Sequence, residues 1–330
     1  MTRRQRLWLP AMVLVMAVVA AACGSDDEPT VSGGGGQPTA PTFPAGSTMA
    51  NIQSKGKLVV GTKFDQPGLG VKNPTNNKLT GFDTDIARLI AVAIFGGTVD
   101  DIDSKIEWKE APTPQRQLLI QNGTVDLIVA TYTINDERKT QIDFAGPYFI
   151  AGQDIMVKAT DTSIKTVTDL NGKKVCSVLD STPAKRVREK APQADLIEFA
   201  SYALCKDELL NGRVAAVSTD NIILLGFVDA NPTLKLVGNR FSDEPYGIGL
   251  EKGDSAFRDF VNNRLEQIYQ NGEWAKAFDA NLKKYGLATP TPPPVDRYQS
   301  TGEVVPAPTV TTAAGGATTT TVAATTSTTR

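Results

Sequence analysis

The segment from about Asn51 to Leu287 predicts an α/β fold built as two units of similar size. Short apolar stretches alternate with stretches whose apolar residues recur at helical spacing, which is typical of a largely parallel sheet flanked by helices. The stretch VDLIVATY, residues 125–132, is apolar almost throughout, as expected of a strand buried on both faces. The alternation starts again at residue 153, and this repetition indicates a second α/β unit.

The first unit opens with the strand KLVVGT, residues 57–62, and the helix GFDTDIARLIAVAIFG, residues 81–96. Ile86, Leu89 and Ile90 lie on one face of that helix, because residues three or four apart are neighbours on a helix surface. Asp83 and Asp85 near its start lack the spacing and the glycine of a calcium loop, so helix capping is the better interpretation. A strand at 105–110, a helix at 113–123 and the strand at 125–132 follow.

The second unit is predicted to contain strands at 153–159, 173–178, 194–200 and 214–219 and helices at 182–191, 202–212 and 220–230. A further strand at 234–238 and the segment EPYGIGLEKGD, residues 244–254, lead into two helices rich in large apolar residues such as Phe257, Trp274 and Phe278. Two lobes of comparable size are therefore expected.

The first 22 residues have the pattern of an export signal. Three arginines precede an apolar run from Leu7 to Ala22, which is shorter than the ~20 residues that a membrane-spanning helix needs. The small residues directly before Cys23 resemble the lipobox of bacterial lipoproteins, and an ordinary signal peptide with an incidental cysteine is the alternative. We expect a lipoprotein signal peptide at 1–22 and a lipidated Cys23 that anchors the protein on the extracytoplasmic face of the cell membrane.

Two further segments lack the apolar periodicity of a packed core. Residues 23–50 are rich in Gly, Pro, Ser and Thr and are expected to form a flexible tether, and residues 288–330 are expected to form a disordered Pro/Thr/Ala-rich tail. The packed region is then limited to residues 51–287.

Composition excludes several kinds of chemistry. The chain contains no histidine, which removes Ser-His-Asp and Cys-His nucleophiles and imidazole metal sites, and we predict no cofactor and no metal. Without residues 1–22 the formal net charge changes from −2 to −5, so nucleic acid is not an expected partner.

Cys176 and Cys205 remain after the lipobox cysteine is set aside. In an exported protein such a pair most simply forms a disulfide, and two buried free thiols are the alternative. Closing a loop of about thirty residues stabilises the fold by roughly 3.5 kcal/mol in the chain-entropy model.

Six segments, KLVVGTKFDQPG, LTGFDTDIA, NGTVDLIVATYTINDERKTQIDFAGPYF, DLNGKKVCSV, GRVAAVSTDNIIL and EPYGIGLEKGD, follow one another between residues 57 and 287. In this order they resemble the extracellular solute-binding proteins of ABC transporters for polar amino acids. The resemblance implies a two-lobed periplasmic-binding-protein-like fold of type II, in which each lobe is a sheet flanked by helices and two hinge strands join the lobes. Crossings near 152–154 and 245–247 would divide the chain into lobe 1, residues 51–152 plus 247–287, and lobe 2, residues 153–246.

The resemblance also implies how an amino acid is held. Arg138 would bind the α-carboxylate, and an arginine suits this role because its planar fork can donate to both oxygens. Thr133 would add a hydroxyl and an N–H, and Thr131 a carbonyl. Asp220 would bind the α-ammonium, although it could also cap the helix that follows it.

Other residues would complete the site. Ser181 and Thr182 open a helix and could contribute to the carboxylate site, although Asp180 stands where many relatives have glycine and would oppose an anion if it pointed inward. Lys63 and Arg116 match positions near the ligand side chain, and two facing cations favour a γ-carboxylate between them. A solvated lysine and a surface arginine are the alternatives.

These residues predict a non-enzymatic, monomeric protein that captures L-glutamate, or else aspartate or glutamine, and delivers it to the transmembrane subunits of an ABC permease. An amino-acid sensor would need the same cleft. A cyclohexadienyl-dehydratase-like enzyme shares the fold, but the absence of histidine disfavours it.

Overall fold

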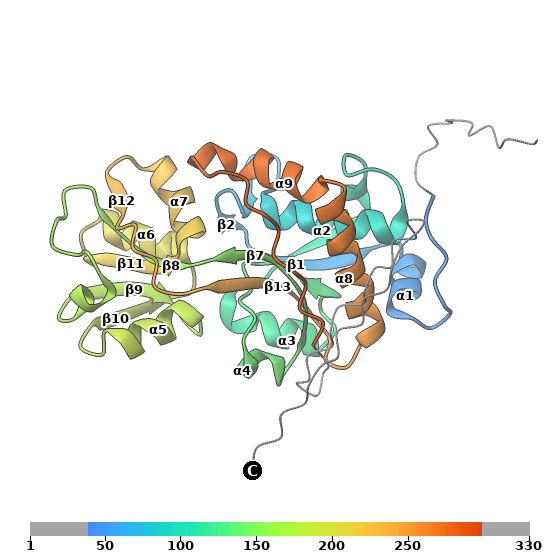
Figure 1. Cartoon of the computed structure of the whole chain (residues 1–330), viewed down its shortest axis with the longest axis horizontal. Helices are drawn as coiled ribbons and strands as arrows, with labels where there is room; N and C mark the ends of the chain where they lie inside the picture. The colour runs from blue at the N-terminus through green and yellow to red at the C-terminus, as the bar shows by residue number, and fades with distance from the viewer. Residues whose placement is uncertain (1–38, 299–330) are drawn as a thin grey trace, which may run out of the picture. The chain divides into compact units, whose positions relative to one another are not determined.

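The structure is a computed structural model that describes residues 39–298, and within this range it contains two five-stranded sheets and a small three-stranded sheet (Figure 1). The first sheet has the order β5-β1-β6-β13-β7, with β1 (Leu58–Thr62), β5 (Ile106–Glu110), β6 (Leu127–Ile128), β7 (Asp143–Ala151) and β13 (Glu244–Leu250). The second has the order β10-β9-β11-β8-β12, with β8 (Gln153–Lys158), β9 (Lys174–Val178), β10 (Asp195–Phe199), β11 (Ala216–Asp220) and β12 (Leu234–Leu236). The small sheet consists of β2 (Asp65–Gln66), β3 (Gly70–Lys72) and β4 (Leu79–Thr80).

Helices flank both five-stranded sheets, so the predicted α/β class with two sheet-and-helix lobes is confirmed. Lobe 1, built on the first sheet, carries α1 (Thr48–Lys55), α2 (Phe82–Phe95), α3 (Arg116–Gln121), α4 (Asp136–Lys139), α8 (Ser255–Gln270) and α9 (Glu273–Asn281). Lobe 2, built on the second sheet, carries α5 (Thr182–Lys190), α6 (Tyr202–Leu210) and α7 (Asn221–Ala230). Short 3₁₀ helices are η1 (Ile102–Lys105), η2 (Thr113–Gln115), η3 (Val167–Leu170) and η4 (Lys283–Tyr285).

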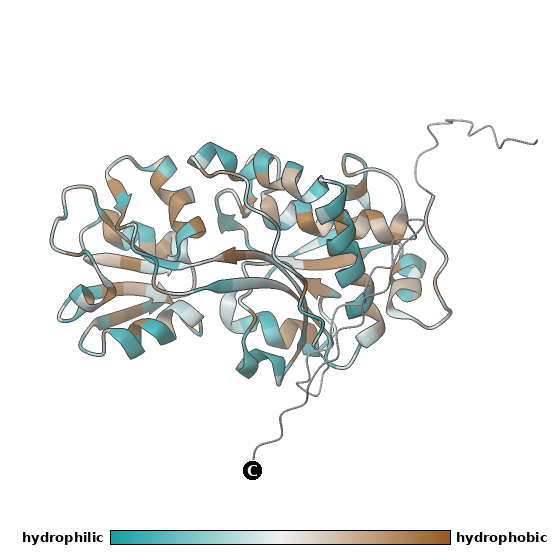
Figure 2. Cartoon of the chain, viewed as in Figure 1, coloured by the Kyte–Doolittle hydropathy of each residue, from teal (hydrophilic) through white to brown (hydrophobic). Residues whose placement is uncertain are grey.

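The core of lobe 1 is aromatic. The ring of Phe82 packs against Tyr148, Phe149, Trp274 and Phe278 with centroid separations of 5.7–6.0 Å. Figure 2 shows hydrophobic residues concentrated along strands such as β1 and β7, while hydrophilic residues alternate with them on the helices. The alternation along the helices is typical of helices that bury one apolar face, as the helical spacing predicts.

The sheets are mixed rather than wholly parallel. Strands β5, β1 and β6 run parallel, but β13 pairs antiparallel with both β6 and β7; in lobe 2, β8 pairs antiparallel with β11 and β12. A parallel connection needs a crossover of a dozen or more residues, usually through a helix. The strands that pass directly between the sheets have no such crossover and enter antiparallel.

Two neighbouring segments carry the chain between the sheets. β7 ends in the first sheet at Ala151, and β8 begins in the second sheet at Gln153. The return segment follows β12: Phe241 N–H donates to the Gln153 carbonyl, and Glu244 then pairs with Ala151 at the start of β13. The chain thus passes between the sheets at residue 152 and again between residues 241 and 244, next to the crossings expected at 152–154 and 245–247.

The ends of the described region are more ordered than their composition suggests. Helix α1 begins at Thr48, capped by the Ser47 side chain, and Phe43 packs edge-on against Phe260. At the other end, Tyr298 is 3% exposed. The predictions of an unpacked tether through residue 50 and an unpacked tail from residue 288 are therefore wrong for these parts, because single aromatic anchors hold segments that lack any apolar period.

The remaining predictions about the ends concern residues outside the described range. They are the signal peptide at 1–22, the lipidated Cys23, the first part of the tether and the tail from residue 299 onward. Between residues 39 and 298, no helix combines the length and the hydropathy needed to cross a bilayer.

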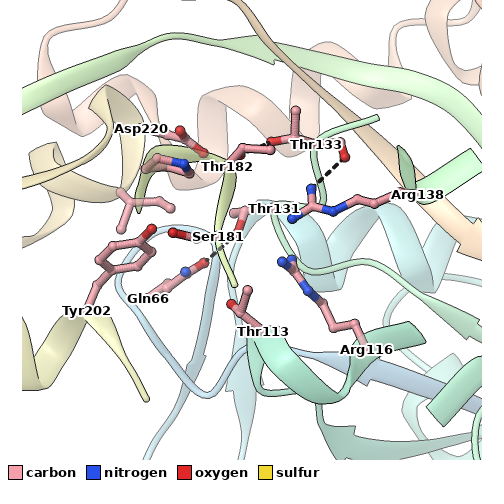
Figure 3. Close-up of a pocket in the computed structure, with 12 residues that line it drawn as sticks. Gln66, Thr113, Arg116, Thr131, Thr133, Arg138, Ser181, Thr182, Tyr202 and Asp220 are labelled. Carbon is pink, nitrogen blue, oxygen red and sulfur yellow. Dashed lines mark hydrogen bonds between the residues drawn. The ribbon is translucent and has the colours of Figure 1, made fainter. Parts of the chain in front are cut away.

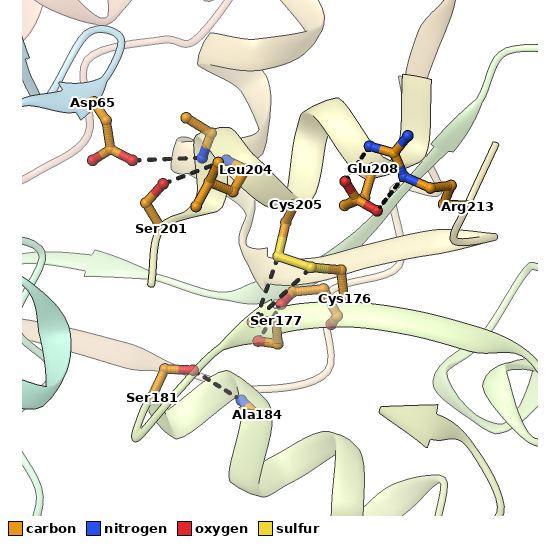
Figure 4. Close-up of a disulfide and its surroundings, with 12 residues drawn as sticks. Asp65, Cys176, Ser177, Ser181, Ala184, Ser201, Leu204, Cys205, Glu208 and Arg213 are labelled. Atoms are coloured by element: carbon orange, nitrogen blue, oxygen red, sulfur yellow. Dashed lines mark hydrogen bonds and ion pairs between the residues drawn. A yellow bond between two sulfur atoms is a disulfide. The ribbon is translucent and has the colours of Figure 1, made fainter. Parts of the chain in front are cut away.

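A disulfide joins Cys176 of β9 to Cys205 of α6, with the two Cα atoms 5.4 Å apart (Figure 4). Both residues are fully buried. The predicted pairing is thus present, and it ties α6 to the sheet of lobe 2.

Candidate functional site

A cavity of about 20 Å³ lies between the lobes (Figure 3). This is room for about one water molecule, so a ligand has to enter with the lobes further apart than they stand here. Each lobe contributes half of the lining residues, which are Gln66, Thr113, Arg116, Thr131, Thr133, Arg138, Ser181, Thr182, Pro183, Tyr202, Asp220 and Ile223. The structure therefore brings together every predicted binding residue except Lys63, whose Nζ donates to the Thr113 hydroxyl at 2.9 Å.

Lobe 1 contributes a wall of two arginines stacked on one ring. The guanidinium carbons of Arg116 and Arg138 lie 4.0 and 4.8 Å from the centre of the Tyr132 ring. Each arginine also donates one Nη1 hydrogen bond to the backbone, Arg116 to the Ala130 carbonyl and Arg138 to the Thr133 carbonyl. A guanidinium carries five N–H donors, so both arginines keep donors for a ligand.

This wall concentrates positive charge in a buried place. Arg116 and Arg138 are 3% and 7% exposed, and Lys63 is 6% exposed, so the alternatives of a solvated lysine and a surface arginine are wrong. Burial, followed by repulsion from Arg138, lowers the pKa of Arg116 to about 10. Burial and repulsion from Arg116 lower the pKa of Lys63 to about 7. An anion between these groups would relieve the repulsion.

Lobe 2 supplies a single carboxylate at the end of β11, that of Asp220. Its Oδ2 accepts from the Tyr246 hydroxyl at 2.7 Å, while Oδ1 is buried and has no hydrogen-bond partner among residues 39–298. Asp220 occupies the N-cap position of α7 but makes no side-chain cap hydrogen bond, so its carboxylate is not used for capping. Burial, followed by the nearby Glu244, raises the pKa of Asp220 to about 7. A cationic group at Oδ1 would complete this site.

Two hydroxyl residues face the cavity at the start of α5. Ser181 caps the helix, because its side chain accepts from Ala184 N–H. The Thr182 hydroxyl lies 3.1 Å from Glu244 Oε2 and 3.4 Å from the Thr133 hydroxyl, so it links the two lobes. Asp180 adopts a left-handed backbone with φ of 58° and lines the adjoining outer cavity rather than this one. Arg138 lines both cavities, so Asp180 shares the outer one with this arginine.

One peptide unit of the wall is held from both sides. The Ala130 carbonyl accepts from Arg116, and the following N–H, that of Thr131, donates to Asp83 Oδ2 at 2.8 Å. Thr131 has a φ of 47°, a conformation that non-glycine residues rarely adopt. Asp83 also accepts from the Tyr148 hydroxyl at 2.9 Å. The helix-capping interpretation of Asp83 is wrong, because the cap is Gly81 and this buried carboxylate fixes the strained peptide instead.

Comparison with known protein families identifies the family of this chain. Residues 58–284 match the profile of the bacterial extracellular solute-binding proteins, family 3. The chain belongs to this family.

Curated relatives of this solute-binding protein include two bacterial binding proteins. It is 38% identical over 282 residues to the ABC transporter glutamine-binding protein GlnH of Bacillus subtilis strain 168, covering 85% of this chain and 98% of that protein. It is 40% identical over 241 residues to the glutamate-binding protein GluB of Corynebacterium glutamicum, covering 71% of this chain and 81% of that protein. The relatives named here are binding proteins.

Two solved structures have a similar fold. An ancestral arginine-binding protein bound to glutamine is 39% identical, with a TM-score of 0.63, over 68% of this chain and 97% of that one. An ancestral amino-acid-binding protein described as a precursor of cyclohexadienyl dehydratase is 31% identical, with a TM-score of 0.65, over 72% of this chain and all of that one. The two-lobed fold of this solute-binding protein is thus shared with solved binding proteins.

Several cavity residues of this solute-binding protein were not found from sequence. Gln66 accepts from the Thr131 hydroxyl at 3.2 Å, and the buried Tyr202 begins α6. Tyr132, the ring beneath both arginines, is part of an apolar strand pattern that predicts only core. These residues act through contacts between distant segments, and no local motif marks them.

Proposed function

We propose that this chain is the substrate-binding component of an ABC importer and that its cavity binds L-glutamate. The observation that carries the proposal is one small cavity with two buried arginines on one side and one incompletely paired buried carboxylate on the other. A buried charge needs an opposite partner, because losing water is otherwise too costly. Glutamate brings two carboxylates and one ammonium, which matches this set of charges.

Each charge of the ligand has a candidate partner. The α-carboxylate would lie on Arg138, with Thr133, Ser181 and Thr182 nearby, and the ammonium on Asp220. The γ-carboxylate would lie on Arg116, with Lys63 behind Thr113. Glutamine would leave this second group of cations without an anion, so we propose glutamate ahead of glutamine. The relatives named for glutamine and glutamate support this ligand class.

The test is calorimetric titration of the full chain with a panel of amino acids. We expect glutamate to bind, with aspartate and glutamine weaker. No heat of binding with any acidic or amide amino acid would refute the proposed ligand class.

Delivery to a permease rests on the relative that is named as an ABC transporter protein. Neighbouring genes for transmembrane and ATPase subunits would support import, whereas a neighbouring signalling partner without them would favour a sensor. We further propose that the protein acts as a monomer held at the outer face of the membrane by a lipid on Cys23. Labelling of the wild-type chain, but not of Cys23→Ser, with a fatty acid would support the anchor.

Substitution of Lys63 should show whether this residue lies near the side chain of the ligand or near its head group. Lys63→Met is expected to weaken glutamate binding by roughly tenfold, because it removes a buried cation near the γ-carboxylate, and to change glutamine binding much less. The measurement is calorimetric affinity for both ligands. Lys57→Met, which removes an exposed lysine before β1, is the control and should change neither affinity. Equal losses for both ligands would show that Lys63 does not face the ligand side chain.

Asp83→Asn should disturb the peptide that it holds. An asparagine side chain has only one oxygen, so it cannot accept from both Thr131 N–H and Tyr148 O–H in the same way. We expect about tenfold weaker glutamate binding through misplacement of Arg116. Asp85→Asn is the matched control, since Asp85 lies on the same helix and pairs with Arg88. Unchanged affinity in Asp83→Asn would assign Asp83 to the core alone.

A further inference from the structure

The last described residues form a strap on lobe 1. We use the term C-terminal strap for residues 295–298, which follow a proline-rich stretch and come after the region matched by the family profile. The Asp296 N–H donates to the Gly146 carbonyl at 2.7 Å, and the Tyr298 hydroxyl accepts from Phe144 N–H at 2.8 Å. Both partners belong to β7, the edge strand of the first sheet. The strap therefore covers hydrogen-bonding groups that an edge strand would otherwise leave open.

Charged side chains fix the strap to α8. Arg297 Nη2 donates to Glu266 at 2.8 Å and to Asn263 at 2.6 Å. The Arg258 guanidinium lies 4.8 Å from the centre of the Tyr298 ring. Because Tyr298 is 3% exposed, its ring is an inserted anchor and not a surface contact.

The same anchor touches α4, the short helix that carries Arg138. Lys139 Nζ lies 4.5 Å above the Tyr298 ring and 3.7 Å from the Asp296 carboxylate. α4 has only four residues, and a helix this short is not stable by its own hydrogen bonds. Its other fixed points include the Asn135 cap and the hydrogen bond from Lys252 to the Lys139 carbonyl. Contacts at Lys139 therefore help to fix the position of Arg138, the residue before it.

A second route leads from the strap to the arginine wall through the core. Tyr298 belongs to the buried cluster that contains Tyr132 and Phe144. Phe144 packs edge-on against Tyr132 with ring centres 5.0 Å apart, and Tyr132 is the ring on which both arginines stack. A void at Tyr298 would loosen the support of that ring, because interiors are close-packed and neighbours relax into a cavity only partly.

We propose that the C-terminal strap is a positioning element for ligand binding, which holds α4 and the Tyr132 ring so that Arg138 and Arg116 face the cavity. The inference rests on the proposed function, because it takes these arginines as the groups that hold the ligand carboxylates. Tyr298 contacts Lys139 and Phe144, neither of which lines the cavity, so it acts through these residues.

The test compares Tyr298→Ala, Tyr298→Phe and a chain that ends at Pro290 with the full chain. We expect Tyr298→Ala and the shortened chain to bind glutamate at least about tenfold more weakly. Tyr298→Phe keeps the ring beneath Lys139 and should stay within about threefold of the wild type. Phe43→Ala is the control, since this ring packs on Phe260 of α8 but lies outside the Tyr132 cluster. It should lower the melting temperature without changing affinity.

Amide hydrogen exchange separates a failure of this inference from a failure of the proposed ligand. In Tyr298→Ala, the amides of residues 138–142, in and directly after α4, should exchange faster than in Phe43→Ala at equal loss of melting temperature. This measurement needs no ligand, so it decides the strap even if the wild-type chain binds no amino acid. If Tyr298→Ala does not fold, Tyr298→Leu fills the space without an aromatic face and takes its place. Unchanged exchange at α4, or unchanged glutamate affinity despite a lower melting temperature, would overturn the proposal.

Discussion

Asp220→Asn is expected to abolish glutamate binding and, in the absence of ligand, to make the protein more stable at about pH 8. The carboxylate is 3% exposed, and its Oδ1 has no partner within the described residues. Ionised Asp220 is therefore incompletely compensated until an ammonium arrives. Asparagine keeps an acceptor for Tyr246 and removes the charge. Losing one partner of a buried ion pair costs about 3–5 kcal/mol, which is roughly a 10²- to 4 × 10³-fold loss of affinity.

The pH dependence of this effect has a definite sign. The folded pKa of about 7 lies above the ordinary value of 3.8, so the folded state binds the proton more tightly than the unfolded state between these values. The contribution of Asp220 to the free energy of unfolding therefore falls as pH rises from about 4 to about 7. Lys63 has the opposite effect above that range. Its folded pKa is lowered from 10.5 to about 7, so between these values the unfolded state binds the proton more tightly, and the free energy of unfolding rises with pH.

Thermal unfolding of the ligand-free wild type and variant at several pH values measures this difference. The loss of stability between about pH 4 and pH 7 should be smaller in Asp220→Asn than in the wild type. Asp229→Asn is the control, because Asp229 lies exposed on the same helix, α7. Retained glutamate binding in Asp220→Asn, or a lower melting temperature than the wild type near neutral pH, would contradict the assignment of the ammonium site.

The fold was predictable because it depends on periodic patterns. Apolar spacing predicts most strands and helices of both lobes, and the cysteine pair in an exported protein predicts the bond between β9 and α6. The spacing does not predict β7, α1, α4 or the small sheet, and the strand expected at 125–132 is only the two-residue β6. The order and direction of the strands were harder to predict from the sequence. The antiparallel β13 is buried along almost its whole length, as expected of a parallel strand, so its direction could not be predicted from its apolar pattern.

The candidate site was partly predictable, since residues near strand ends and helix starts carry local signals. These local signals could not assign a role to Asp220, because an aspartate at this position fits both ligand binding and helix capping. Only the absence of a cap hydrogen bond in the structure separates the two roles. Contacts between distant segments carry no local signal. Asp83 holds a peptide 48 residues away, and Tyr298 binds Phe144 across 154 residues from a Pro/Thr-rich segment whose composition resembles disorder.

Arg138→Ala is expected to abolish binding of every amino acid that the protein takes, whatever its side chain. The guanidinium makes one backbone hydrogen bond, to the Thr133 carbonyl, and is held over the Tyr132 ring, so its other donors are oriented before the ligand arrives. Such preorganisation lowers the entropy lost on binding. Removing the partner of a buried carboxylate costs about 3–5 kcal/mol, or roughly 10²- to 4 × 10³-fold in affinity.

Arg138→Lys distinguishes the shape of the group from its charge. Lysine keeps the charge but cannot donate two parallel hydrogen bonds or stack as a plane on Tyr132, so we expect a loss of roughly 10- to 100-fold, as for one charge-assisted hydrogen bond. Calorimetry with glutamate, aspartate and glutamine should show the same relative loss for all three, because they share the head group. Arg188→Ala, which removes an exposed arginine paired with Glu198, should change none of them. A loss confined to glutamate and aspartate would instead place Arg138 at the side-chain end, and Arg116 would then be the group that holds the α-carboxylate.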